Sequence, residues 1–143
     1  MNQGEAGPLL HYFQRKQNEN PSLAYAIRLN MDDHITNIFW TDAKMSTDYH
    51  QFGDVICFDT TYRINRDCRP FAPFVGINNH KETVVFGAAL LYDETIESFK
   101  WLFEAFIEAM AGQKPKTILT DQDQAMANAI ASVMPETGHR LCL

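Results

Sequence analysis

The 143-residue chain is long enough to bury one core, and its 45% apolar and 21% charged residues are typical of a soluble globular domain. Its net charge of −6, with 12 scattered Lys and Arg residues, argues against a broad electrostatic surface for nucleic acid. No apolar stretch is long enough to cross a bilayer and no signal-peptide core follows the first residues, so we expect no membrane partner.

The first part of the chain predicts a small leader, residues 9–53, that packs on a main domain. Alternating apolar and polar residues have the period of half-buried strands, and Asp42 and Gly53 are the expected cap and end of a short helix. The expected elements are a disordered N-terminus at 1–8, a helix at 9–17, hairpin strands at 23–29 and 35–41, and a helix at 42–53.

The main domain, residues 54–143, alternates strands with helices. Pro70 and Pro73 have no amide donor, so regular pairing in the second strand is expected only from Phe74. Thr95 is the expected cap of a strongly amphipathic helix. The expected elements are strands at 55–62, 71–78 and 84–92, a helix at 96–110, a strand at 117–120, a helix at 122–134 and the start of a strand at 139–143.

This order predicts an α/β fold with one mixed sheet. Short polar connections favour an antiparallel meander for the first three strands, and the helical crossover makes strand 117–120 parallel to strand 55–62 and its neighbour. Asp59 and Asp121 then emerge at the same edge of the sheet. The predicted architecture is ribonuclease-H-like, and the last strand is expected to be incomplete.

Asp59 and Asp121 are the candidate metal ligands. Each ends an apolar strand, and a hard divalent cation prefers carboxylate oxygens, so the pair suits metal-dependent phosphoryl transfer. The alternatives are plainer: Asp59 as a turn residue, Asp121 as the cap of the following helix, and Asp123 as a first-turn helix residue. An aspartyl nucleophile of the haloacid-dehalogenase type is disfavoured, because Thr61 stands where a second Asp is needed.

The histidines and cysteines give weaker signals. The five His share no metal-ligand spacing, and His139 with Cys142 is at best half of a zinc site, so structural roles are favoured. Three Cys without a C-x-x-C pair, one of them Cys57 within an apolar strand, indicate reduced thiols. The expected compartment is the cytoplasm or the nucleus.

Several segments, in order and spacing over about residues 9–143, resemble the plant far-red-impaired-response family, whose members are transcription regulators descended from Mutator-like transposases. The segments that carry the resemblance are IFWTDAK (38–44), FDTTYR (58–63), PFAPFVG (70–76), ESFKWLF (97–103), LTDQD (119–123) and HRLCL (139–143).

The resemblance implies a transposase-derived domain of ribonuclease-H-like fold. Asp59 and Asp121 match the first two acidic residues of the family's triad, which hold Mg²⁺ or Mn²⁺, whereas the third lies downstream of this chain. The family's C-x-x-H motif would begin at Cys142. Its zinc-binding domains, through which such proteins contact DNA, are also outside this sequence.

The leading hypothesis is therefore a partial domain of a nuclear transcription regulator, non-catalytic and serving as an interaction or scaffold module that forms homo- or hetero-oligomers with family members. The alternative is the core of a metal-dependent DNA transposase or nuclease that is complete only with downstream residues. A third reading is a truncated gene product without activity of its own.

Overall fold

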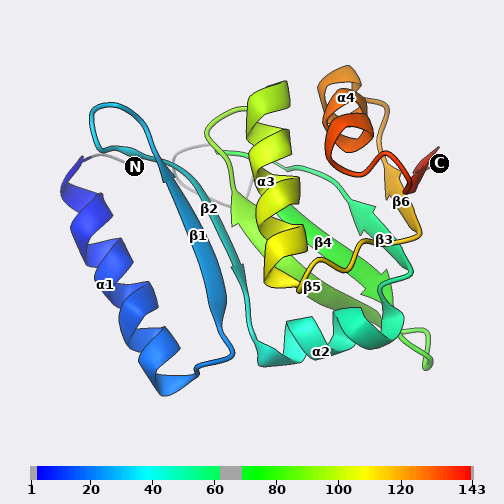
Figure 1. Cartoon of the computed structure of the whole chain (residues 1–143), viewed down its shortest axis with the longest axis horizontal. Helices are drawn as coiled ribbons and strands as arrows, with labels where there is room; N and C mark the ends of the chain where they lie inside the picture. Colours follow the sequence, from blue (N-terminus) through cyan, green and yellow to red (C-terminus); the bar gives the residue numbers. More distant parts are fainter. Residues whose placement is uncertain (1–2, 62–68, 143) are drawn as a thin grey trace.

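A computed structural model describes residues 3–61 and 69–142, in which helices and a single mixed sheet account for most of the chain (Figure 1). Its elements are α1 (Gln3–Glu19), β1 (Ala24–Leu29), β2 (Ile35–Thr41), α2 (Ala43–Phe52), β3 (Val55–Phe58), β4 (Phe71–Ile77), β5 (Thr83–Leu90), α3 (Ile96–Ala109), β6 (Thr117–Thr120), α4 (Gln124–Val133) and β7 (Gly138–Leu141). Residue 62, at the end of the strand predicted at 55–62, and Cys68 lie outside the described residues. No described helix is both long and apolar enough to span a membrane.

The strand order, β1-β2-β5-β4-β3-β6-β7, confirms the predicted topology of the main domain. β3, β4 and β5 are antiparallel neighbours, whereas β6 lies parallel to β3 and β7 parallel to β6. α3 connects β5 to β6, α4 connects β6 to β7, and both helices lie over the same face of the sheet (Figure 1). The five strands that are adjacent in the sheet in the order β5, β4, β3, β6 and β7 form the ribonuclease-H-like part of the fold.

The segment predicted to be a leader that packs on the main domain also contributes two strands to its sheet. β2 pairs with β5, with Ile38 opposite Leu90, so the hairpin extends the sheet by two strands. The helix also begins earlier than predicted, at Gln3 instead of Leu9, and Pro8 lies within it. Disorder was expected from Gly and Pro at 1–8, but one missing amide donor does not stop a helix whose next turns pack on the hairpin through Phe13.

The expectation that β4 pairs regularly only from Phe74 is wrong, since pairing with β5 begins at Phe71. Thr61 and Phe71 exchange both backbone hydrogen bonds, so Phe71 directs its amide toward β3 and not toward β5. Two residues on, Pro73 has the same orientation, and its missing N–H therefore faces Asp59. The proline interrupts the β3–β4 ladder and remains paired with Ala88 of β5.

The main core lies between the sheet and α3, as the amphipathic pattern at 96–110 predicts. Phe106 stacks on Phe74 with ring centroids 4.1 Å apart, and the edges of Phe39 and Tyr49 pack against it. Thr95 caps α3 by accepting a hydrogen bond from the amide of Ser98. This packing fixes the α3 side of the sheet and therefore the ends of β3 and β6.

Candidate metal site

Asp59 lies directly after β3, at the point where the strand loses its pairing. Pro73 opposite it has no amide to donate, so the chain leaves the ladder after Phe58. The side chain of Asp59 turns back on its own backbone, where Oδ1 accepts a hydrogen bond of 2.7 Å from the amide of Thr60. The interruption of the ladder thus exposes one carboxylate at the sheet edge and fixes one of its oxygens.

Asp121 follows β6 in the same way, and the structure brings the two predicted residues together. Because β3 and β6 are parallel neighbours, with Cys57 opposite Leu119, their C-terminal ends meet at one edge. The carboxyl groups of Asp59 and Asp121 lie near enough to each other that Asp121 raises the pKa of Asp59. Both side chains are exposed to solvent, so the pair is accessible from outside the protein.

The environment disfavours a second negative charge at this edge. Partial burial raises the pKa of Asp59 above its ordinary value, and the hydrogen bond and charge of Asp121 and the charge of Glu94 raise it further. The amide of Thr60 opposes these effects, because it stabilises the ionised form. Two carboxyl groups in contact share a proton or are neutralised by a cation.

Glu94 is a neighbour of the site that the sequence analysis did not identify. It lies between β5 and α3, and its Oε1 accepts a short hydrogen bond from the hydroxyl of Thr60. A single Glu next to the helix cap Thr95 carries no local signal; only the tertiary arrangement, in which the start of α3 meets the end of β3, could have indicated it. Among the residues that the structure describes, no three His, Cys, Asp or Glu side chains form a group that could hold a metal ion.

The neighbouring acidic residues have structural roles. Asp123 is the N-cap of α4 and accepts a hydrogen bond of 2.8 Å from the amide of Met126, so the reading of Asp121 as the cap is wrong. Asp93 is partly buried, which raises its pKa, but hydrogen bonds from Ser98 and Thr95 outweigh this and hold the pKa below its usual value. These contacts leave Asp121 and Asp59 as the carboxylates that face each other.

His139 is held within the fold. Its Nε2 lies 2.6 Å from the hydroxyl oxygen of Thr120, and that hydroxyl donates its one proton to the carbonyl oxygen of Asp121. Cys142 and Cys57 are free thiols, and partial burial, with a smaller effect from Cys142, raises the pKa of Cys57. These contacts support structural roles for His139 and Cys57.

Comparison with known proteins gives a consistent relationship. Residues 55–143 match the MULE transposase domain family. The whole chain is 44% identical over 143 residues to Protein FAR-RED IMPAIRED RESPONSE 1 of Arabidopsis thaliana, covering 17% of that protein. It is also 44% identical over 140 residues, 98% of the chain, to Protein FAR1-RELATED SEQUENCE 4 from the same plant, covering 19% of it. The chain thus spans less than a fifth of the length of these relatives.

Proposed function

Because the chain belongs to the MULE transposase domain family and to its far-red-impaired-response branch, we propose that it is a domain of a plant nuclear transcription regulator and acts there as a non-catalytic interaction module. The family relationship makes the domain transposase-derived. The same proposal covers two properties of the whole regulator. It contacts DNA through zinc-binding domains in other parts of the protein, and it forms oligomers with family members.

One observation carries the regulator reading. The transposase-domain match begins at residue 55, whereas the similarity to the two far-red-response relatives extends over 143 and 140 residues. The hairpin and α1, which precede the transposase-domain match, are therefore within the region of similarity to these relatives. This extended similarity supports the regulator hypothesis more than the hypothesis of an isolated transposase core.

A second function, a metal-dependent DNA transposase or nuclease core, is favoured by the contact between Asp59 and Asp121. Their oxygens fit Mg²⁺ or Mn²⁺, since Mg²⁺ is commonly bound by one or two carboxylates with water completing the shell. A bound cation would polarise a phosphoryl oxygen or a water molecule. In this function Thr60 orients Asp59 through its amide, and Glu94 restrains the same turn through the Thr60 hydroxyl.

The two functions differ in whether the protein cleaves DNA. The assignment of a metal ion to Asp59 and Asp121 is tested separately. Mn²⁺ titration of the chain, followed by electron paramagnetic resonance, is expected to show one bound ion whose affinity falls at least about tenfold in Asp59→Asn and in Asp121→Asn. Glu97→Gln removes an exposed carboxylate from the first turn of α3 and serves as the control. If neither Asp substitution alters Mn²⁺ binding, the metal assignment is abandoned.

The same proteins are then incubated with labelled duplex and single-stranded DNA in Mn²⁺. The non-catalytic proposal predicts no cleavage beyond the level of the Asp59→Asn variant. Cleavage by the unaltered chain that disappears in both Asp variants and persists in Glu97→Gln would overturn that proposal and establish the nuclease function.

A further inference from the structure

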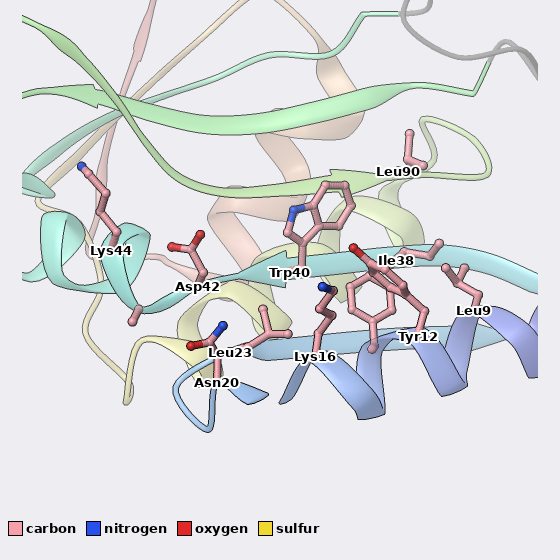
Figure 2. A pocket seen from close by; sticks show the side chains of 12 residues that line it. Leu9, Tyr12, Lys16, Asn20, Leu23, Ile38, Trp40, Asp42, Lys44 and Leu90 are labelled. Carbon is pink, nitrogen blue, oxygen red and sulfur yellow. The ribbon is translucent and has the colours of Figure 1, made fainter. Parts of the chain in front are cut away.

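A second candidate binding site lies away from the acidic edge, in a groove between α1, β2 and the start of α2. The groove has a volume of about 630 Å³, and its lining includes Leu9, Phe13, Ile38 and Trp40 (Figure 2). We call it the α1 groove. Pockets of this size, mostly apolar with a few polar groups at the rim, are the usual form of a ligand site.

The floor of the α1 groove is made of packed aromatic rings. Phe13 is buried and stacks on Tyr25, with ring centroids 5.0 Å apart. The ring centroids of Phe13 and Trp40 are 6.4 Å apart. Tyr12 forms part of the wall and is 45% exposed. The groove therefore offers an apolar surface on which an apolar side chain of a partner can be buried.

The ionised side chains that line the groove are two lysines and one carboxylate. Lys16 comes from α1 and Lys44 from α2, and they stand at different parts of the rim (Figure 2). The carboxylate, Asp42, is engaged as the N-cap of α2, where it accepts a hydrogen bond of 2.9 Å from the amide of Met45. The lining thus has an excess of positive charge in a chain whose net charge is −6.

The two lysines form local ion pairs, and the ammonium of Lys16 also lies over the ring of Tyr12, 5.8 Å from the ring centroid. Lys16 lies 3.6 Å from Glu19 and Lys44 lies 2.8 Å from Asp48, and the lysine side chains are 42% and 81% exposed. Glu19 is 56% exposed, and because exposed pairs contribute little to stability, a carboxylate from a partner can replace Glu19 at small cost. Asp48 is only 16% exposed, but Lys44 is exposed enough for its ammonium to donate to a partner's carboxylate alongside Asp48.

We propose that the α1 groove binds a short acidic amphipathic segment of a partner protein, with an apolar side chain over Trp40 and flanking carboxylates paired with Lys16 and Lys44. The proposal rests on the interaction role proposed above and identifies the surface that performs it. Binding of an amphipathic segment in an apolar groove, with charges at the rim that select the partner, is a common mode of peptide recognition.

The two tryptophans allow a direct test on the ¹⁵N-labelled chain. Trp40 lies in the groove, whereas Trp101 is on α3 and packs against the main core. The probe is a synthetic peptide with Leu and Phe flanked by Asp and Glu, and its control carries Lys at every acidic position. The acidic peptide is expected to shift the indole N–H signal of Trp40 and leave that of Trp101 unchanged.

Charge dependence is tested with Lys16→Glu/Lys44→Glu, which should weaken the acidic peptide at least about tenfold and favour the Lys peptide. Lys114→Glu, at an exposed position away from the groove, is the matched control. Ala43→Phe adds bulk at the exposed lip and should weaken both peptides, which keeps the test valid if the double variant misfolds.

The proposal is overturned if Trp40 does not respond, if both peptides bind the unaltered chain equally, or if Trp40 shifts with protein concentration alone, which would indicate a second copy as the occupant. Each of these results is independent of DNA cleavage, so failure of the groove proposal is distinguishable from failure of the non-catalytic function.

Discussion

Replacing Asp59 with Asn isolates the contact between the two carboxyl groups at the sheet edge. The amide is close in shape to the acid, its oxygen can still accept the hydrogen bond from the amide of Thr60, and its nitrogen can donate to Asp121. The variant therefore keeps the local geometry and removes one negative charge from a site where burial, Asp121 and Glu94 all disfavour it. We expect Asp59→Asn to increase the free energy of unfolding at pH 7 in metal-free buffer.

The size of this gain follows from the exposure of the pair. Two like charges about 4 Å apart repel by about 1 kcal/mol in a dielectric like that of water, and solvent around the exposed Asp59 keeps the interaction near this lower limit. For a domain of this length, about 1 kcal/mol corresponds to an increase in Tm of about 3 °C. The gain should shrink in 1 M salt, where the screening length is about 3 Å.

The sign of the pH dependence follows from the raised pKa. The folded chain binds a proton at Asp59 more tightly than the unfolded chain, whose Asp titrates near 3.8. The contribution of Asp59 to stability therefore falls as the pH rises from that value through the folded pKa, and it remains lower at neutral pH. In Asp59→Asn this decline is absent, so the difference between the two proteins should be small at pH 3 and largest above the folded pKa.

Urea unfolding measures both effects. Mn²⁺ at 100 times its dissociation constant should stabilise the unaltered chain by about 2.7 kcal/mol and the variant, with at least tenfold weaker affinity, by no more than about 1.4 kcal/mol. Glu136→Gln removes an exposed carboxylate at a distance from the pair and controls for net charge. The reasoning is refuted if Asp59→Asn is no more stable than Glu136→Gln without metal, or if Mn²⁺ stabilises both Asp59→Asn and the unaltered chain equally.

Three further substitutions test the fold that positions this site. Phe106→Ala should lower the free energy of unfolding by about 4 kcal/mol, because loss of the fully buried ring leaves a cavity beside Phe74. In the same urea experiment the control Ile77→Ala, at a side chain that is 63% exposed, should change the free energy of unfolding by less than about 1 kcal/mol. Asp123→Ala should cost about 1 kcal/mol through loss of the α4 cap and lower the Tm measured by circular dichroism; no change in Tm would contradict its assignment as the cap. Gly53→Ala should cost more than about 2 kcal/mol, because its Cβ would lie 2.3 Å from the Cδ1 atom of the buried Tyr49; a stable variant in thermal unfolding would mean that this turn relaxes.

The sequence was sufficient to predict the parallel half of the sheet. The helix at 96–110 separates two apolar strands, and a right-handed crossover places the second strand beside the first, which brings Asp59 and Asp121 to one edge. This inference needs only element types and their order, both of which local patterns carry well. The observed pairing of β3 with β6 confirms it.

The remaining features depended on contacts that no local pattern contains. The hairpin could be predicted from alternation, but its pairing with β5 joins Ile38 to Leu90, which lie far apart in sequence. Glu94 reaches the site through a hydrogen bond from the hydroxyl of Thr60, which no local pattern indicates. We expected Pro73 to weaken β4, because the residue type shows only that an amide donor is missing. Whether that amide would face β3 or β5 depends on the register of the strands, which the sequence does not reveal.

The two proposed sites lie in different parts of the sheet and can be altered independently. The acidic pair lies just after the ends of β3 and β6, within the region that matches the transposase domain, and we expect its charges to destabilise the metal-free protein. The α1 groove is lined almost entirely by residues 9–44, before that region begins, with Leu90 of β5 as the exception. A substitution that abolishes metal binding should therefore leave groove binding intact, and changes to Lys16 and Lys44 should not alter Mn²⁺ affinity. If Asp121→Asn weakened peptide binding at the groove, the two sites would be coupled through the sheet, and a role for the cation in controlling the interaction surface would follow.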